Sequence, residues 1–282
     1  MQHHDRESGP AMTDAECVAF LQWALPRLGL RWPGFRKVRR QVRKRLARRL
    51  GTLGLPTLAA YRARLADDPA EWQVLDGLCR ITISRFYRDR AVFDALARQV
   101  LPALAVRAAG DGRPVRCWSA GCASGEEAYS LKMLWDLDLG EAERAPGLEV
   151  TGTDAGDDLL ARARRGCYAP GSLKDVPAHR RAQAFEARDG LFCVRARHRA
   201  GVRFVRQDLR HRAPEGPFDL VLCRNLAFTY FEPELQTAVL ARIAGAMAAG
   251  GYLAIGNHER LPHAHGFAPV TGAPCLHRRV DP

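Results

Sequence analysis

The feature that most constrains this fold is the stretch from Val115 to Ser130, which reads Val-Arg-Cys-Trp-Ser-Ala-Gly-Cys-Ala-Ser-Gly-Glu-Glu-Ala-Tyr-Ser. It begins like a buried strand, continues as a turn of small residues and ends like the start of a helix. Gly121 and Gly125 keep the turn thin, so a ligand can approach the backbone where larger side chains would block it. This order of elements is typical of the nucleotide-binding corner of an α/β fold.

The two acids that follow the turn, Glu126 and Glu127, indicate which kind of ligand this corner suits. A site for phosphate leaves the helix N-terminus free of acids, because its N–H groups and its dipole must meet an anion. A ligand that combines adenosine with positive charge fits better, and S-adenosylmethionine, with a sulfonium and an ammonium group, fits best. Gly-x-x-x-Gly also occurs in ordinary turns, so this segment alone leaves a purely structural turn open.

Further apolar segments downstream end in polar residues and alternate with helical patterns, which predicts a doubly wound, mostly parallel sheet. In such sheets the ligand lies at the carboxyl ends of the strands. The predicted strands are 148–154, 202–206, 218–223 and 252–256, and the predicted helices are 157–165 and 233–248.

Asp154 stands at the end of the second predicted strand, where an acid can accept hydrogen bonds from both ribose hydroxyls of a nucleotide. It could instead cap the helix that follows, as could Asp157 or Asp158. Asp219, near the start of a later strand, is interpreted as a buried acid that caps a neighbouring turn.

Five strings of the chain stand out, namely Thr82-Ile-Ser-Arg-Phe-Tyr-Arg-Asp89, Trp118 to Ser130, Thr153-Asp154, Ala163-Arg-Arg-Gly-Cys-Tyr168 and Pro217-Phe-Asp-Leu-Val-Leu-Cys-Arg-Asn225. Together they resemble the CheR-type chemoreceptor methyltransferases, which transfer a methyl group from S-adenosylmethionine to glutamate side chains of bacterial chemoreceptors. Order and spacing agree with the family plan from about residue 15 to residue 260.

The resemblance implies a Rossmann-like methyltransferase with a small all-helical N-terminal domain, and S-adenosylhomocysteine as the product. Arg88 also suits the carboxylate of the methionine moiety through a charge-assisted fork, although a surface ion pair with Asp89 or Asp94 is the alternative. The implied cofactor-binding residues are Thr82, Ser84, Arg88, Ala120, Gly121, Glu126, Asp154, Asp208, Leu209, Arg224 and Asn225.

Arg224, Asn225 and Tyr230 are the expected catalytic residues, with Arg224 holding the substrate carboxylate. No general base is needed, because a glutamate with an ordinary pKa of about 4.3 is ionised at neutral pH, so alignment and desolvation would supply most of the effect. The family pattern Arg-Asn-x-x-x-Tyr-Phe is one residue longer here, ending at Phe231. Either Tyr230 reaches the site through a bulge, which we favour, or Thr229 takes its place. This departure weakens the receptor assignment more than the cofactor assignment.

A basic segment from Arg36 to Leu50 contains nine Lys or Arg and no acid, and so carries +9 of the net charge of +12. Apolar residues at every fourth position predict an amphipathic helix. Its basic face could bind nucleic acid, an anionic membrane or an acidic protein helix, or could simply be solvated. No aromatic residues interleave, which counts against single-stranded nucleic acid, and the resemblance favours an acidic receptor helix docked by Arg39, Arg40, Arg43 and Arg45.

Length and composition set the outer limits. We expect a helical domain over 12–95 and a methyltransferase domain over 96–282, with a short inserted subdomain near 169–201. Without an apolar membrane span or a signal-peptide core at residues 1–8, we expect a cytoplasmic monomer with no membrane insertion and no nucleic-acid partner. The eight cysteines form no Cys-x-x-Cys pair, so neither a disulfide framework nor a metal site is expected. The alternative functions are a small-molecule carboxylate methyltransferase on the same scaffold and a non-catalytic S-adenosylmethionine-binding module.

Overall fold

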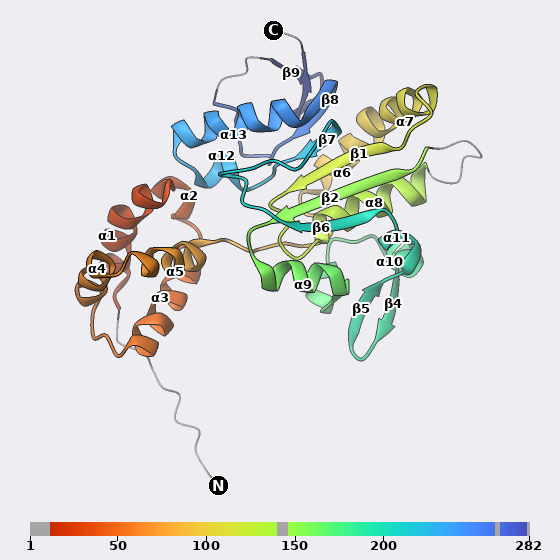
Figure 1. The fold of residues 1–282 in the computed structure, drawn as a ribbon. Helices are drawn as coiled ribbons and strands as arrows, with labels where there is room; N and C mark the ends of the chain where they lie inside the picture. Colours follow the sequence, from red (N-terminus) through yellow and green to blue (C-terminus); the bar gives the residue numbers. More distant parts are fainter. Residues whose placement is uncertain (1–11, 140–145, 263–265, 281–282) are drawn as a thin grey trace. The chain divides into compact units, whose positions relative to one another are not determined.

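The computed structural model describes residues 12–139, 146–262 and 266–280 (Figure 1). Residues 1–8, on which the absence of a signal peptide was argued, lie outside these ranges. The chain forms two compact units, of which the first contains residues up to Ile81 together with Thr229–Glu232, and the second contains Thr82–Phe228 and the rest of the chain from Pro233. This division falls earlier than the expected boundary at residue 95, because helix α6 (Arg90–Ala95) packs on strand β10 (Ala273–Arg279) of the second unit.

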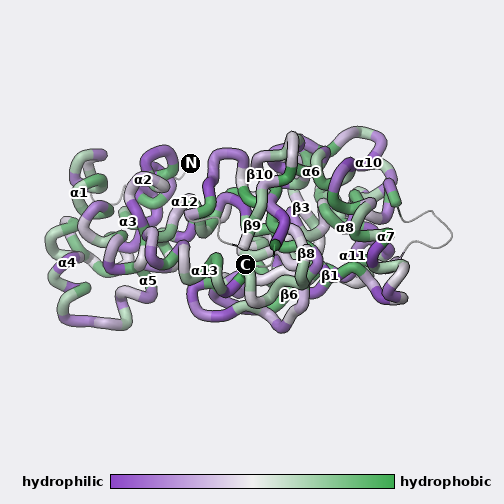
Figure 2. Tube along the Cα trace, turned by 90° about the horizontal axis from the view of Figure 1, so that it is seen from above, coloured by the Kyte–Doolittle hydropathy of each residue, from purple (hydrophilic) through white to green (hydrophobic). Residues whose placement is uncertain are grey.

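The first unit is all-helical, and capping residues set the ends of its helices. Thr13 and Glu16 form a capping box, Thr57 accepts a hydrogen bond from the amide of Ala60, and Asp68 caps a helix whose first residue is a proline. Hydrophilic and hydrophobic stretches alternate along these helices (Figure 2). The helices are α1 (Asp14–Ala24), α2 (Trp32–Phe35), α3 (Arg39–Leu53), α4 (Leu58–Asp67) and α5 (Pro69–Cys79).

Helix α3 is the predicted basic amphipathic helix, and its apolar stripe faces the core. Val42, Leu46 and Leu50 are at most 1% exposed. At the end of the helix, Arg49 forms a fork with the buried carboxylate of Glu71, at 2.9 Å and 2.5 Å. The stripe therefore packs as the spacing predicted, while some of the basic residues serve the fold itself.

The second unit is built on a seven-stranded sheet in the order β6-β2-β1-β7-β8-β10-β9. The first five strands are parallel to one another, and β10 is antiparallel to both of its neighbours. From β1 the chain builds the sheet outward through β2 to β6 and then returns to the other side of β1 with β7, so the strand order reverses between β1 and β7. The strands are β1 (Val115–Ala120), β2 (Leu148–Asp154), β6 (Val202–Arg206), β7 (Phe218–Leu222), β8 (Met247–Ala254), β9 (Phe267–Val270) and β10.

Helices flank this sheet, as the alternating pattern predicted (Figure 1). Helix α8 (Glu126–Asp138) contacts β1, β2 and β6 and is buried along most of its length, and α9 (Asp157–Arg165) contacts β2 and β6. Helix α13 (Pro233–Ala246) leads into β8, whereas α7 (Leu101–Gly110) leads into β1. The fold class is confirmed, and the predicted strands and helices are present with ends within two residues of the predicted ones, except that β8 (Met247–Ala254) begins five residues before the predicted start at 252.

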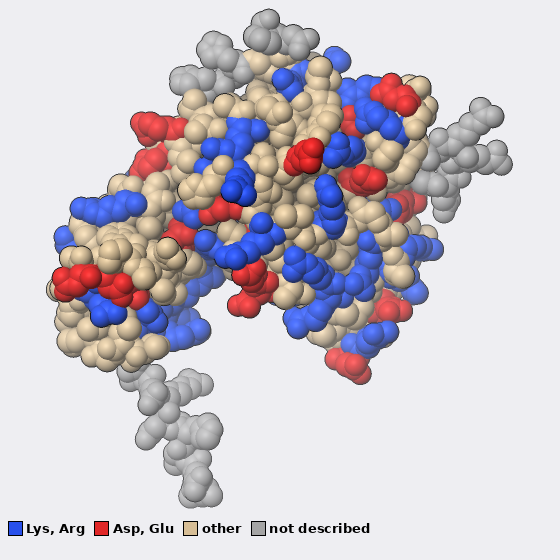
Figure 3. All heavy atoms as spheres, viewed as in Figure 1, with Lys and Arg blue, Asp and Glu red and all other residues tan. Residues whose placement is uncertain are grey.

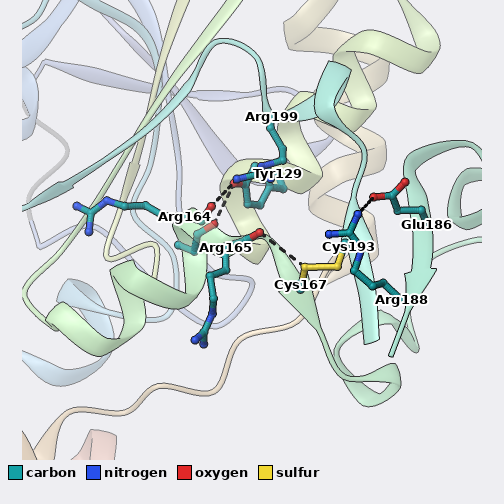
Figure 4. The surroundings of a disulfide bond; sticks show 9 residues. Tyr129, Arg164, Arg165, Cys167, Glu186, Arg188, Cys193 and Arg199 are labelled. Atoms are coloured by element: carbon teal, nitrogen blue, oxygen red, sulfur yellow. Dashed lines mark hydrogen bonds and ion pairs between the residues drawn. A yellow bond between two sulfur atoms is a disulfide. The ribbon is translucent and has the colours of Figure 1, made fainter. Parts of the chain in front are cut away.

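Between α9 and β6, where a short inserted subdomain was expected near 169–201, the chain forms a small antiparallel sheet in the order β3-β5-β4. Cys167 of β3 (Cys167–Tyr168) lies opposite Cys193 of β5 (Leu191–Val194), and the two form a disulfide bond, shown in Figure 4. The expectation that the cysteines form no disulfide is wrong, because strand pairing brings together two residues that are 26 apart in the sequence. Strand β4 (Phe185–Arg188) completes this sheet, and α11 (Ala196–Arg199) follows it. No helix among the described residues is long and apolar enough to cross a membrane.

Candidate functional site

The turn after β1 needs glycine at two positions. Gly121 has a φ of +73°, and a Cβ atom there would lie 2.3 Å from Cδ2 of Leu226, which follows β7. Gly125 has a φ of +90°, and a Cβ atom there would lie 2.9 Å from the ring of Phe204 in β6. The turn is fixed to β2 because the amides of Gly121 and Cys122 both donate to the carbonyl of Thr153, at 2.8 Å and 2.9 Å. This close packing lies where the strand order reverses, which is the usual ligand position in open α/β sheets.

Asp154 joins the end of β2 to the glycine turn. Its Oδ2 accepts a hydrogen bond from the amide of Ala123 at 3.0 Å, and its Oδ1 accepts one from the amide of Gly156 at 2.8 Å. The second bond fixes the turn before α9 but does not cap the helix, whose N-cap residue is Gly156 and has no side-chain cap, so capping by Asp154, Asp157 or Asp158 is wrong. Each carboxylate oxygen can accept more than one hydrogen bond, so the ribose role stays a prediction.

The two acids at the start of α8 have different partners. Glu126 is 1% exposed and accepts hydrogen bonds from Ser124 Oγ at 3.0 Å and 2.9 Å, with Arg162 3.5 Å away. Glu127 accepts from Ser119 Oγ at 2.7 Å and from Arg224 at 3.0 Å. Sequence reasoning selected Glu126 for the site and missed Glu127, although the paired acids were a signal for both.

Arg224, which follows β7, donates three hydrogen bonds. Its Nη1 donates to Glu127, and its Nη2 donates to Asp89 at 2.9 Å and to the carbonyl of Arg88 at 2.7 Å. The side chain is 2% exposed, and its Nε has no hydrogen-bond partner among the described residues. Since two carboxylates already compensate this guanidinium, it is well placed to join three segments of the chain, and its role toward a substrate carboxylate stays a prediction.

Asn225 follows in the left-handed region, with a φ of +54°, and its Nδ2 donates to Asp89 at 3.2 Å. The turn that it begins is held by Glu259, a residue that sequence reasoning missed. Glu259 is 8% exposed, and its carboxylate accepts hydrogen bonds from the amides of Asn225 at 2.7 Å, Gly256 at 2.7 Å and Leu226 at 3.2 Å. Its only sequence signal was an acid three residues after the glycine that follows an apolar strand.

Asp208 and Leu209 follow β6. Burial alone would raise the pKa of Asp208, but hydrogen bonds from Arg210 outweigh that effect and leave its pKa below the ordinary value. Arg210 forms a fork with this carboxylate, at 3.0 Å and 2.7 Å. Leu209 is buried, and its carbonyl accepts a hydrogen bond from Arg242. Asp208 therefore remains ionised at neutral pH.

The segment from Thr82 to Asp89 belongs to the second unit and reaches the same strand ends through Asp89. Thr82 and Ser84 are half-buried, and Arg88 donates to the carbonyl of Ile83 at 2.6 Å. The proposed surface ion pair of Arg88 with Asp89 or Asp94 is wrong, because Asp89 is bonded to Arg224 and Asp94 lies 3.8 Å from Arg90.

Tyr230 and Thr229 belong to the helical unit, where they pack on helix α2. The ring of Tyr230 lies edge-on to Phe35, with 5.2 Å between centroids, and its carbonyl accepts a hydrogen bond from the amide of Arg31. The carbonyl of Thr229 accepts from Arg31 Nε at 3.1 Å. These contacts anchor the lengthened segment, and the choice between the two hydroxyls stays a prediction.

The arginines expected to dock a substrate differ in how free they are. Arg39 forms a fork with Asp14, Arg43 lies 3.7 Å from the same acid, and Arg45 donates to the carbonyl of Leu78. Arg40 is exposed. It lies on a stripe of exposed basic residues at every fourth position, namely Arg36, Arg40, Lys44 and Arg48.

The strand ends therefore carry a thin glycine turn, an acid at the end of β2, and a buried arginine paired with two partly exposed carboxylates. Among the described residues no group of three His, Cys, Asp or Glu side chains could hold a metal ion. The acid-rich surroundings and the turn of small residues fit an adenosine-type ligand that carries positive charge. The unpaired Nε of Arg224 leaves a donor for a polar acceptor.

Two family models match the chain. The model described as CheR methyltransferase, SAM binding domain, matches residues 82–274, and the model described as CheR methyltransferase, all-alpha domain, matches residues 37–75. Among the relatives, a chemotaxis protein methyltransferase of Listeria monocytogenes is 31% identical over 76% of this chain and 80% of its own length.

Two further relatives are similar to the chain. Chemotaxis protein methyltransferase 1 of Pseudomonas aeruginosa is 35% identical over 62% of this chain and 65% of its own. An uncharacterised 104.1 kDa protein of Rhodobacter capsulatus is 36% identical over 78% of this chain, which spans only 23% of that protein.

Proposed function

Because the chain belongs to the CheR methyltransferase family, we propose that it transfers a methyl group from S-adenosylmethionine to glutamate carboxylates of a chemoreceptor. The observation that carries the proposal is the convergence, at the reversal point of the sheet, of the glycine turn after β1 with the Arg224-Asn225 turn after β7. Both turns lie within the matched S-adenosylmethionine-binding domain.

The residues at the strand ends fit this cofactor. Asp154 would accept hydrogen bonds from the ribose hydroxyls, and Gly121 would let the ligand lie against the backbone. Arg88, whose described hydrogen bond goes to a neutral carbonyl, keeps a charge that suits the carboxylate of the methionine moiety. When bound, the cofactor supplies a methyl group on a positively charged sulfur.

The chain would act by positioning, since an ionised carboxylate needs no base. Arg224 would hold Asp89 and Glu127 in fixed positions at the strand ends through its two ion pairs. The hydroxyl of Tyr230 is the favoured contact for the acceptor carboxylate, with Thr229 as the alternative.

We propose that the acceptor is an acidic helix of a chemoreceptor and that it meets the exposed basic stripe of α3. Two of the relatives carry the name chemotaxis protein methyltransferase. Arg40, Lys44 and Arg48 are exposed, and none of them forms an ion pair within 4 Å among the described residues, which suits a glutamate-rich surface. We further propose that the protein acts in the cytoplasm as a monomer.

The first test is calorimetric titration with S-adenosylmethionine and S-adenosylhomocysteine. Asp154→Ala should weaken binding at least about tenfold, because hydrogen bonds to a charged acceptor contribute about 1.5–3 kcal/mol each. Asp154→Asn keeps one acceptor oxygen, so its affinity for the cofactor should lie between those of the wild type and Asp154→Ala. Asp157→Ala, an exposed acid on the neighbouring helix, is the matched control and should bind like the wild type.

The second test is transfer of a labelled methyl group to a receptor fragment whose candidate glutamates are present or replaced by glutamine. Label should appear only on the fragment with glutamates, and Arg40→Glu with Lys44→Glu should reduce its incorporation. Failure to bind the cofactor at millimolar concentration would refute the methyltransferase function. Cofactor binding with transfer only to small carboxylic acids would refute the receptor as acceptor.

A further inference from the structure

A second basic surface lies on the methyltransferase unit, along the edge strand β6. Figure 3 shows Lys and Arg side chains gathered over the region of α9 and β6. We call the following exposed residues the β6 arginine surface: Arg164 and Arg165 of α9, Arg199 of α11, and Arg203 and Arg206 of β6.

The positive charge of this surface is largely uncompensated, although its side chains are held in place. Arg164 donates to the carbonyl of Phe204 at 3.0 Å, and Arg199 donates to the carbonyl of Arg164 at 2.6 Å (Figure 4 shows Arg164, Arg165 and Arg199). Arg203 donates to the Thr151 hydroxyl at 2.9 Å. These acceptors are neutral, so the bonds restrict the guanidinium groups without cancelling their charge.

Within the described residues, Arg206 alone of this surface has an acid within 4 Å. It lies 3.4 Å from Asp157, and both side chains are 69% exposed. An ion pair between such exposed groups contributes little. The β6 arginine surface therefore presents uncompensated positive charge, and hydrogen bonds restrict three of its guanidinium groups, those of Arg164, Arg199 and Arg203.

The sheet edge beneath these arginines is open to a partner. Among the described strands, β6 is the last of the sheet on this side, and β2 is its one partner. The described connection from β6 to β7, residues 207–217, contains no helix that could cover it. Val205 is 39% exposed and lies on the same face of β6 as Arg203, two residues before it, so an apolar contact adjoins the charge there.

We propose that the β6 arginine surface binds an acidic helix of the protein that is methylated, at a distance along that protein from the glutamate that reacts. The inference rests on the proposed function, because a protein modified on glutamates carries further carboxylates besides the one that reacts. Arginine forks bind carboxylates through two parallel hydrogen bonds. Because neutral bonds already restrict three of the side chains, less conformational entropy is lost on binding.

A protein helix is favoured over nucleic acid for two reasons. The exposed large hydrophobic residues of the described chain include Val205 and no aromatic residue, so no stacking platform for bases lies here. An exposed valine between arginines also suits the mixed apolar and acidic face of a helix better than it suits a phosphate backbone.

The test measures binding of the full chain to a fluorescent helical peptide with glutamate at every third or fourth position. Arg165→Glu combined with Arg203→Glu should weaken binding about tenfold, because two attractions become repulsions. Arg98→Glu combined with Arg278→Glu makes the same charge change at exposed positions outside the surface, and should change the affinity less than about twofold. The same peptide with glutamine in place of glutamate should not bind.

Each other outcome overturns the proposal. Equal losses in the two double variants would mean that net charge alone acts, and no loss in Arg165→Glu/Arg203→Glu would mean that the surface does not bind the peptide. Tighter binding of duplex DNA or of vesicles containing anionic lipid, abolished by the same variant, would assign the surface to those partners. Calorimetry with S-adenosylmethionine separates this proposal from the proposed function, because the β6 arginine variants should bind the cofactor like the wild type.

Discussion

Replacing Glu259 should destabilise the turn that carries Arg224 and Asn225 more than any other single carboxylate change at the strand ends. This side chain is 8% exposed and accepts hydrogen bonds from three backbone amides, at 2.7 Å, 2.7 Å and 3.2 Å. Hydrogen bonds to a charged group contribute about 1.5–3 kcal/mol each, and a buried donor without an acceptor costs about 1–3 kcal/mol. Glu259→Ala should therefore lower the free energy of unfolding by roughly 3–6 kcal/mol.

Glu259→Gln removes one acceptor oxygen but keeps the side chain, so it distinguishes the loss of one hydrogen bond from the loss of all three. A glutamine oxygen in the place of Oε2 still accepts from the amides of Asn225 and Gly256, whereas its NH₂ group faces the amide of Leu226, donor against donor. Only the longest bond is lost, so the cost should be about 1–2 kcal/mol. The expected order of stability is wild type, then Gln, then Ala.

Urea unfolding measures these differences, with Glu215→Ala as the control, since Glu215 is exposed on the connection before β7. The Glu215 variant should stay within about 0.5 kcal/mol of the wild type. A loss below about 1 kcal/mol for Glu259→Ala would refute the reasoning, because it would mean that water replaces the carboxylate at all three amides. Cofactor affinity should fall in the same order, since the turn faces the glycine turn at Gly121.

Three further predictions follow from buried or strained positions. Burial alone would raise the pKa of Asp219, but hydrogen bonds from Arg113, the Arg116 amide and Arg107 lower it below its ordinary value. The wild type should therefore be more stable than Asp219→Asn above about pH 5, and this difference in the free energy of unfolding should shrink as the pH falls below about 4. Urea unfolding across this pH range measures the difference. Reduction of the Cys167–Cys193 bond should destabilise the small sheet by about 3 kcal/mol, given the separation of 26 residues. Amide exchange in β3 and β5 should become faster on reduction, and the reductant should have no such effect on a variant with both cysteines replaced by serine. Gly121→Ala should weaken cofactor binding about tenfold. Gly112 is the control, because it also has a positive φ, +63°, but a Cβ atom there would meet nothing within 4 Å. Gly112→Ala should lower the free energy of unfolding by the backbone cost of about 1–2 kcal/mol and leave cofactor affinity unchanged.

The main elements were predictable because local patterns decide them. Strand 148–154 and helix 157–165 occur with the predicted bounds, since an apolar run and a capped amphipathic segment each have one stable solution. The glycine turn was also predictable. Only glycine tolerates both the positive φ of Gly121 and Gly125 and the close approach of Leu226 and Phe204.

Side-chain partners were not predictable, because the fold brings them together from distant positions. Glu259 binds amides 33 and 34 residues away, and Glu127 meets an arginine 97 residues away. The partners of the arginines in the basic helix were unpredictable for the same reason. The periodicity of this helix predicted which face is buried, but only the position of Asp14 and of the carbonyl of Leu78 decides that Arg39 and Arg45 serve the fold while Arg40 stays exposed.

The buried network around Arg224 changes how a catalytic test at this position must be read. Removing this guanidinium would leave Asp89 and Glu127 at the strand ends without their shared positive charge, and an uncompensated charge in a buried site is strongly destabilising. Arg224→Ala would therefore displace the segment around Asp89 and the start of α8, and would lose activity even if the arginine never touches the acceptor. Arg224→Ala combined with Glu127→Gln and Asp89→Asn removes the charges together. If that triple variant regains cofactor binding but not methyl transfer, Arg224 acts on the acceptor, and if it regains both, the arginine serves to position the strand ends.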